Sequence, residues 1–438
     1  MANGESILSC DSPLASLGMT TFTIPYGRSS ISASVPEQYK PDLITLTPHP
    51  AVTDPLLAVK SALDGLLGKV SWEDFSGVKT AAVAINDKTR PVPHQYLLPP
   101  LLKKLESLGL AAQDIKLIIA TGTHQPMTRD EFAAVLPDEI LARYPVLCHD
   151  SDDVDNLINL GATGRGTPVR INRDYLRADL RIVVGNIEPH QFQGFSGGAK
   201  SAAIGLAGRN TINHNHAMMT DKAARLGHYD HNPPRQDVEE IGRMIGIHLA
   251  LNAILNDKKE IVKVVAGEPT AVMSAGILLA QAICLAKVPA QYDLIIASPG
   301  GHPKDINVYQ AQKGLAHASL ITRDGGTVIL VAACPEGTGS LGYERWVTAI
   351  DSNETVLARF AQQEFQIGPH KAFQIARDAT RVNVLLVSEM DPDFVRQLLL
   401  TPATSLQDVL DTAVDQLPPK ARVGIMPKAN ATIPQMSA

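Results

Sequence analysis

Three short apolar runs in the first half of the chain each end in a polar, turn-forming cluster. Val78–Ile85 leads into NDKTRPVP, Ile115–Ala120 into TGTHQPMT, and Leu180–Val184 into GNIEPHQFQGFSGG. Gln95–Leu108 has apolar residues at helical spacing, and a capping-box pattern at Thr128 predicts a second helix. Strands that alternate with helices indicate a parallel sheet, so the sequence predicts an α/β fold.

The polar clusters lie where a parallel sheet places its ligand. In open parallel sheets the ligand occupies the crevice beyond the carboxyl ends of the strands. All three clusters follow directly on a predicted strand. We therefore expect their side chains to meet at one site, although they are far apart in the sequence.

A second α/β unit is expected after residue 288. An apolar helix, Ala271–Ala286, precedes Pro289, and new strands are predicted at Leu294–Ala297 and Thr327–Ala332. We predict two α/β domains with parallel-rich sheets, one over residues 1–288 and a smaller one over residues 289–438. An active site is expected in the cleft between them, with most of its candidate residues in the N-terminal domain.

The end of the chain is predicted to be only partly ordered. Residues 404–416 have the pattern of a closing helix, which could pack back on the N-terminal domain. From Pro418 onward the sequence is rich in Pro, Ala and Lys, and we expect it to fray apart from a short strand at Arg422–Met426.

Composition excludes several classes of protein. The formal net charge of −6 offers no basic patch for nucleic acid, and no apolar stretch is long enough for a membrane span. Residues 1–18 lack the features of a signal peptide and are expected to be a loose leader. The four cysteines, at positions 10, 148, 284 and 334, form no CxxC motif and are typical of reduced thiols in a cytoplasmic protein.

The segment Asn186–His216 has the highest density of reactive residues. It contains five glycines, Lys200, and the histidines His190, His214 and His216. Its GFSGGAK run satisfies neither the Walker A pattern nor the GxGxxG spacing. An isolated Gly-Gly-x-Lys is most often a turn with an exposed lysine, but three flanking histidines favour a site. A partly buried lysine can become a nucleophile or covalent anchor, and histidine is the usual base and metal ligand.

Other candidate residues follow neighbouring strands. DKTRP places Asp87 and Arg90 at a strand end, where an arginine can hold a carboxylate or phosphate with two hydrogen bonds. His124 follows the next strand. In the second unit, Gln310 and Lys313 are spaced to share a helix face, which could be an ordinary polar surface or one wall of a cleft for a small anion.

Taken together, these motifs resemble those of the nickel-pincer-dependent lactate racemase family of 2-hydroxy-acid racemases and epimerases. The matching pieces are DKTRP (87–91), GTHQPMT (122–128), PHQFQGFSGGAK (189–200), His216 and YQAQK (309–313), in the family's order and close to its spacing. They cover the chain from about residue 85 to 315, with a weaker similarity at GPHKAF (368–373).

The resemblance implies a cytoplasmic isomerase that inverts the C2 stereocentre of a small 2-hydroxy acid through hydride transfer to and from a nickel-pincer nucleotide. This cofactor is a Ni(II) complex of a pyridinium bisthiocarboxylic acid mononucleotide, made by dedicated biosynthetic enzymes. The resemblance assigns the covalent thioamide attachment to Lys200 and the nickel ligand to His216, with His214 left open. It assigns the acid and base to His124 and His190, the cofactor turn to Asp87, Lys88, Thr89 and Arg90, and the substrate contacts to Arg90, Gln310 and Lys313.

One position departs from the family pattern, and two other readings stay open. Gln125 stands where an arginine is common among relatives, so the substrate could have a tail unlike that of lactate. One alternative is a metal-free enzyme that forms a Schiff base between Lys200 and a keto acid. The other is a non-catalytic binding protein for a nucleotide or sugar acid. A homo-oligomer is compatible with each of these.

Overall fold

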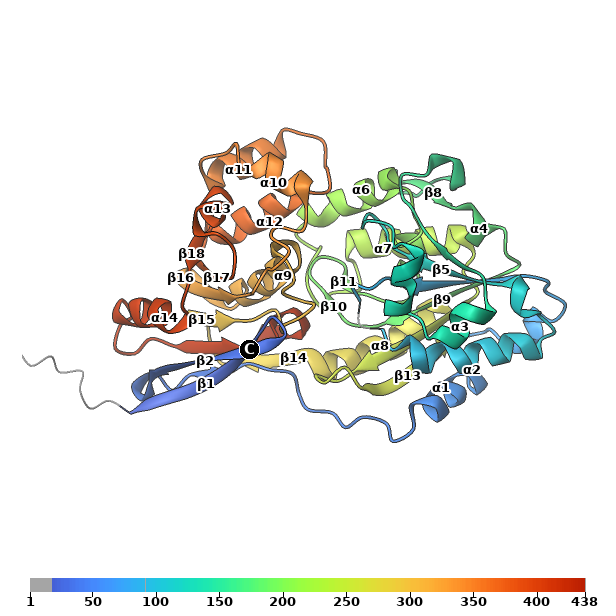
Figure 1. The fold of residues 1–438 in the computed structure, drawn as a ribbon, viewed down its shortest axis with the longest axis horizontal. Helices are drawn as coiled ribbons and strands as arrows, with labels where there is room; N and C mark the ends of the chain where they lie inside the picture. The colour runs from blue at the N-terminus through green and yellow to red at the C-terminus, as the bar shows by residue number, and fades with distance from the viewer. Residues whose placement is uncertain (1–17, 91, 438) are drawn as a thin grey trace, which may run out of the picture.

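The computed structural model describes residues 18–90 and 92–437, folded into two lobes around two six-stranded sheets. Figure 1 shows the lobes side by side, with the green and cyan segments in one and the orange and red segments in the other. The predicted class, an α/β fold with two parallel-rich sheets, is confirmed.

The first sheet carries the three strands predicted from the polar clusters at its centre. Its order is β13-β12-β9-β4-β5-β6, and every neighbouring pair is parallel except β12 and β13. The strands are β4 (Ala81–Asn86), β5 (Ile115–Ala120), β6 (Val146–Cys148), β9 (Leu180–Asn186), β12 (Leu249–Leu255) and β13 (Ile261–Gly267).

This sheet is buried on both faces, which explains why its central strands are continuous apolar runs. One face packs against α1 (Pro55–Asp64) and α2 (His94–Ser107). The other face packs against α5 (Lys200–Ala203), α7 (Pro233–Ile245) and α8 (Pro269–Cys284). Alternate residues of β4 divide between the two cores: Val83 and Ile85 face the first group, and Ala82 and Ala84 face the second.

The second sheet is parallel throughout, in the order β18-β17-β16-β15-β19-β3. One face is covered by α9 (Val308–Ser319) and α12 (Pro369–Ala379) with α10 (Leu341–Val347) and α13 (Pro392–Gln397). The other face is covered by the β1–β2 hairpin and α14 (Leu406–Asp415). The strands are β3 (Asp42–Leu43), β15 (Tyr292–Ala297), β16 (Thr322–Val331), β17 (Asn383–Val387), β18 (Thr401–Ala403) and β19 (Val423–Met426).

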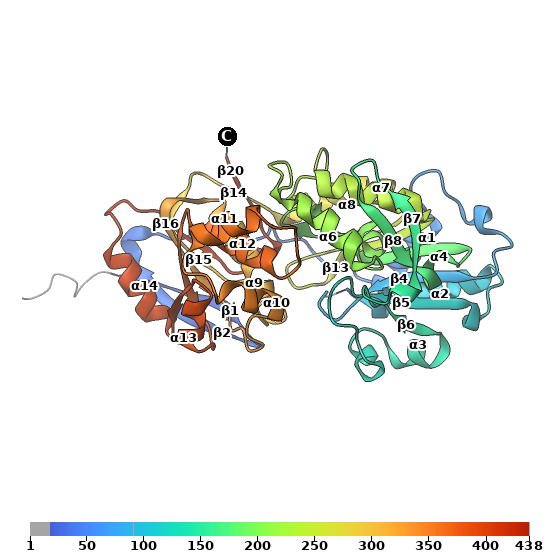
Figure 2. The same cartoon turned by 90° about the horizontal axis from the view of Figure 1, so that it is seen from above.

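The start of the described chain belongs to the second lobe, which corrects the expectation that residues 1–288 form one N-terminal unit. β1 (Met19–Tyr26) and β2 (Ser29–Pro36) form a hairpin whose buried Ile24 and Val35 pack on the second sheet, and β3 extends that sheet beside β19. The blue hairpin lies beside the orange and red elements in both views (Figures 1 and 2). The hairpin and α14 together remove the apolar face of the second sheet from water, which favours this position for the hairpin. α14 therefore packs on its own lobe.

The last residues also differ from the prediction of a frayed tail. β20 (Ile433–Met436) pairs in parallel with β14 (Leu285–Val288), directly after α8. Ile433 is buried in the core of the first lobe. The backbone hydrogen bonds of this ladder hold a segment whose Pro- and Ala-rich composition gave no strand signal. The expected strand at Arg422–Met426 is present as β19.

The segment after Thr128 forms the predicted capping box but not a long helix. Thr128 and Glu131 make both reciprocal contacts, and a 3-10 helix runs over Arg129–Ala134. Pro137 then precedes α3 (Asp138–Arg143). Proline disfavours helical geometry in the residue before it, so the helical stretch is divided in two.

No helix in the described ranges is long and apolar enough to cross a membrane. Cys148, Cys284 and Cys334 are free thiols, and burial raises the pKa of each of the three. Cys10 and most of the predicted leader, residues 1–17, lie outside the described residues.

Two buried histidines make the free energy of unfolding sensitive to mild acid. Nδ1 of His94 donates to Val135 O at 3.0 Å, and Nδ1 of His317 donates to Ala429 O at 2.6 Å. Burial lowers the pKa of each imidazole to about 4, against an ordinary value of 6.5. Below pH 6.5 the two imidazoles become protonated in the unfolded chain but stay neutral in the folded chain. The free energy of unfolding therefore decreases as the pH falls.

Chemical denaturation is therefore expected to show a loss of about 2 kcal/mol per histidine between about pH 7 and about pH 5. The variant His317→Gln, which has no group that titrates there, should show a smaller loss over the same range. An equal loss in the variant and the parent would contradict the assignment to His317.

Candidate active site

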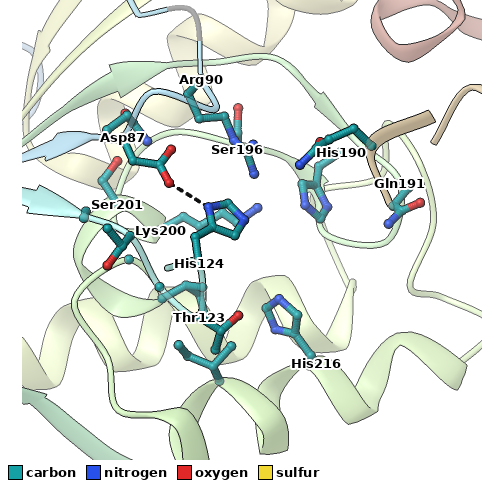
Figure 3. Close-up of a pocket in the computed structure, with 18 of the residues that line it drawn as sticks. Asp87, Arg90, Thr123, His124, His190, Gln191, Ser196, Lys200, Ser201 and His216 are labelled. Carbon is teal, nitrogen blue, oxygen red and sulfur yellow. Dashed lines mark hydrogen bonds and ion pairs between the residues drawn. The ribbon is translucent and has the colours of Figure 1, made fainter. Parts of the chain in front are cut away.

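A pocket lies beyond the carboxyl ends of β4, β5 and β9 and is lined by residues of both lobes. The space free of protein atoms in the pocket and at its mouth comes to roughly 1040 Å³, open solvent included, so a small organic ligand can enter. The three histidines His124, His190 and His216 lie around a common space with Lys200 (Figure 3). The predicted site residues that line the pocket are Asp87, Arg90, His124, His190, Lys200, His216, Gln310 and Lys313.

Four other positions considered from the sequence do not line this pocket. Lys88 points away from it and pairs with Glu131. Thr89 supports the site from behind, because its hydroxyl donates to Asp87 Oδ1 at 2.7 Å. His214 is exposed, and its Nδ1 lies 2.9 Å from the Thr167 hydroxyl. Gln125 is also exposed, so its departure from the family pattern makes no contact in the pocket.

Asp87 fixes the orientation of His124. Nδ1 of His124 lies 2.6 Å from Asp87 Oδ2, so a neutral ring donates its Nδ1 proton to the carboxylate and keeps the lone pair of Nε2 free. Burial alone would raise the pKa of Asp87. The hydrogen bond and charge of His124, with Arg90 and Thr89, outweigh burial and lower that pKa to about 2. His124 is therefore arranged as a base.

His190 has the opposite arrangement. The backbone N–H of Gln193 donates to His190 Nδ1 at 3.2 Å, so in the neutral ring the proton sits on Nε2. Burial and the positive charges of Lys200 and Lys313 hold the pKa of His190 well below its ordinary value. The two histidines thus offer the pocket one acceptor and one donor.

Lys200 is held at the start of α5 by a glycine turn. Gly197 and Gly198 both have positive φ angles, of 85° and 56°, and a Cβ on Gly198 would lie 2.6 Å from Met273 Cγ. Such a turn requires glycine for both its backbone geometry and its close packing. Burial, followed by Arg90 and Arg235, lowers the pKa of Lys200 well below its ordinary value. An uncharged amine is the form that can act as a nucleophile.

The buried Arg235 of α7 stabilises this turn through hydrogen bonds to its backbone. Its guanidinium donates to Phe195 O at 3.0 Å and to Gly197 O at 3.2 Å, and it pairs with Glu239 one helical turn away. The sequence analysis missed Arg235. Its only signal was a charged pair at helical spacing, and such pairs are usually on the surface.

His216 faces the pocket from α6 (Arg209–Ala217). Its ring packs edge to face on Phe192, which in turn packs on His190. Burial, with Lys200 and Lys371, lowers the pKa of His216 to about 3, so the imidazole is neutral, as a metal ligand must be. In the described part of the chain, no three His, Cys, Asp or Glu side chains are grouped to hold a metal. A metal next to His216 would need its other donors from a non-protein group.

The C-terminal lobe supplies the facing wall from α9 and α12. Tyr309, Gln310 and Lys313 come from α9, and His370 and Lys371 from α12. The sequence analysis predicted Gln310 and Lys313, but it saw only a weak similarity at GPHKAF and assigned no role to His370 or Lys371. Histidine and lysine at a helix start carry no signal of their own when the sequence does not show what faces them.

Two family models together match most of the chain. The model of the lactate racemase N-terminal domain matches residues 26–227, and that of the lactate racemase C-terminal domain matches residues 287–433. A lactate racemase of Lactiplantibacillus plantarum is 31% identical over 420 residues, covering 93% of this chain and 98% of the relative. A lactate racemase of Thermoanaerobacterium thermosaccharolyticum is 28% identical over 428 residues, covering 95% and 99%.

Solved structures agree. The lactate racemase apoprotein of T. thermosaccharolyticum has a TM-score of 0.88 at 27% identity, covering 95% of this chain and all of that one. A Thermotoga maritima protein has a TM-score of 0.67 at 17% identity, covering 89% of this chain and all of that one, and it shows the fold alone. The matched family models and the relatives, which align over nearly the whole length, establish that the chain belongs to the lactate racemase family.

Proposed function

We propose that this protein is a racemase or epimerase that inverts C2 of a small 2-hydroxy acid with a nickel-pincer nucleotide bound at Lys200 and His216. The observation that carries the proposal is one pocket containing an amine with a lowered pKa, a neutral imidazole, and two further histidines with opposite proton positions. Family membership supports it, because the two curated relatives are named lactate racemases.

The residues present fit such a cofactor. Lys200 offers an amine that can be acylated, and His216 offers one imidazole where a pincer would supply the remaining metal donors. When bound, the nickel pincer supplies a two-electron acceptor for the hydrogen on C2. Arg90 is placed to contact the group near the carboxyl end of β4, and Asp87 and Thr89 keep that turn in shape.

The protein's own part in the reaction begins with His124. The hydrogen on a carbinol carbon is a poor acid, so its removal becomes easier when a base takes the hydroxyl proton at the same time. Nε2 of His124 is the base, and Asp87 stabilises the imidazolium that forms. When the planar keto acid presents its second face, its keto oxygen needs a proton donor on the other side of the pocket. The Nε2–H of His190 offers that proton.

The cations of the pocket keep the intermediate in place. Arg90 has guanidinium N–H groups beyond those that contact Thr89, and Lys313 extends from the facing lobe. Together they would hold the carboxylate next to C2, so that the keto acid turns without escaping. A pocket with one wall on each lobe can exclude water when the lobes close.

The metal-free alternative draws on the same lysine. An amine with a lowered pKa also suits Schiff-base formation with a keto acid. Borohydride in the presence of substrate traps such a Schiff base and inactivates the enzyme, whereas a nickel-dependent racemase would be unaffected by that treatment unless the cofactor itself is reduced. Inactivation by a keto acid and borohydride together, in protein without nickel, would favour this alternative.

The direct test is to co-express the chain with cofactor-making enzymes and to measure its intact mass, its nickel content and the optical rotation of single enantiomers of 2-hydroxy acids. We expect a covalent adduct at Lys200, about one nickel per chain, and loss of optical activity in at least one substrate. Protein that carries the adduct but inverts no 2-hydroxy acid would refute the function.

Replacing Asp87 by asparagine should lower kcat by roughly 10²–10⁴-fold, because the carboxylate that orients His124 and stabilises its imidazolium is lost. KM should change little, since Asp87 holds no substrate group. Steady-state kinetics with the racemised substrate measure both constants. The acid limb of the pH profile should also move in the variant, which a purely structural role for Asp87 would not cause.

A further inference from the structure

The pocket wall formed by the C-terminal lobe offers hydrogen-bond donors almost exclusively. Lys371 is buried there, with 2% of its surface exposed. Its Nζ donates to Gln312 Oε1 at 3.1 Å and to Gln374 Oε1 at 3.0 Å, and it lies 4.4 Å from the centre of the Tyr309 ring. Both amide oxygens are therefore already engaged.

The neighbouring groups follow the same pattern. Lys313 Nζ donates to Gln310 Oε1 at 2.7 Å. The Gly368 N–H donates to His370 Nδ1 at 3.1 Å, so the proton of the neutral ring sits on Nε2, which lies 3.4 Å from the Tyr309 hydroxyl. The Tyr309 oxygen accepts that proton's hydrogen bond, and its own O–H remains free to donate. What remains for a ligand is a set of N–H and O–H groups.

Among the described residues, Lys371 is the lysine of this wall that has no carboxylate nearby: the charges that act on it are those of Arg90 and Arg377. Glu188, which lines the same pocket, interacts electrostatically with Lys313 and Arg90 instead. Burial, followed by Arg90 and Arg377, lowers the pKa of Lys371 to about 7. An unpaired buried ammonium is costly, and an anionic ligand at this position would remove that cost.

We propose that the site takes a 2-hydroxy acid with a second carboxylate, of which malate is the simplest, and that Lys371 and Tyr309 bind this second carboxylate. The inference rests on the proposed function, in which Arg90 and Lys313 hold the carboxylate next to the reacting carbon. The two residues that bind the second carboxylate, Tyr309 and Lys371, then come from the helices α9 and α12, which pack against each other.

Other substrate tails fit this wall less well. An alkyl or aromatic tail would bury the Lys371 ammonium without any compensating partner. A polyhydroxylated tail brings no charge to the ammonium, and the Gln310, Gln312 and Gln374 oxygens, which could accept from its hydroxyls, each already accept a hydrogen bond from a lysine. A carboxylate only accepts hydrogen bonds, so it matches what the wall offers.

The test compares malate with lactate in the cofactor-loaded protein and in its variant Lys371→Gln, which keeps an N–H for the two amide oxygens but loses the charge. We expect the parent to prefer malate in kcat/KM. The variant should lose about 10- to 100-fold in kcat/KM for malate and about twofold or less for lactate. Lys371→Arg should recover part of the loss, and Arg396→Met, which removes an exposed charge of the same lobe outside the pocket, should change neither substrate.

Binding is measured on the same samples by calorimetry, and cofactor content by intact mass. Preferential binding of malate without turnover of any 2-hydroxy acid would refute the proposed function but keep the second-carboxylate site. Turnover with no malate preference, or an equal loss for both substrates in Lys371→Gln, would refute that site alone. Loss of the cofactor from Lys371→Gln would also refute it, because Lys371 would then hold the nucleotide phosphate.

Discussion

Lys200→Ala is expected to leave the folded protein without its cofactor. The lysine sits on a turn that Gly197, Gly198 and the buried Arg235 hold in one conformation, so its amine has a fixed position in the pocket. Alanine removes the only group proposed to join the nucleotide covalently. Intact-mass measurement of co-expressed protein should show no adduct, nickel should fall to background, and racemisation should be undetectable.

Two control variants test whether the charge of Lys200 or the loss of any lysine could explain this result. Lys200→Arg keeps a positive charge but offers no amine that could form the thioamide, so it should fail as completely as alanine. Lys116→Ala removes a lysine that pairs with Asp174 away from the pocket, and it should load normally. A cofactor mass that survives in Lys200→Ala would exclude the covalent attachment at this residue.

His190→Asn is expected to separate cofactor binding from catalysis. The asparagine oxygen can still accept from the Gln193 N–H, so the loop keeps its shape while the imidazole is lost. Nickel content and adduct mass should match those of the parent, whereas kcat should fall by at least about 10²-fold. The deuterium isotope effect on kcat, measured with substrate labelled at C2, shows whether transfer of the C2 hydrogen still occurs and limits the reaction.

The matched change is His49→Asn, on a partly buried histidine outside the pocket, which should have no effect on either quantity. Because racemisation has an equilibrium constant of unity, kcat/KM should fall by the same factor for the two enantiomers in His190→Asn, whereas kcat and KM taken separately can differ between them. Normal turnover of both enantiomers would remove His190 from the mechanism.

Much of the candidate site could be predicted because local sequence determines where it lies. Asp87, His124 and Lys200 each follow an apolar run that forms a buried strand, and the carboxyl ends of parallel strands meet at one edge. The sheet order did not need to be known for this inference. For the same reason the strand β5 was predicted at its observed bounds.

The remaining features depend on tertiary contacts that no local pattern encodes. Lys371 matters because Tyr309, Gln312 and Gln374 face it, and these come from another helix or the next turn of its own. Lys88 belongs to the same DKTR motif as Asp87 but points outward, since adjacent residues of a turn cannot all face one side. The β20 strand forms because β14 offers an open edge, not because its sequence favours strands.

The placement of the β1–β3 strands has a consequence for the lobes as separate pieces. The second lobe is assembled from both ends of the chain, and its hairpin covers an apolar face that includes Ile296, Ile329 and Val331. A fragment cut at residue 288 would begin after this cover, and it would also separate β20 from its partner β14. Neither half is a self-sufficient folding unit, so the two lobes should unfold together, and this protein can be split, swapped or fused by domain only if its first strands travel with its last.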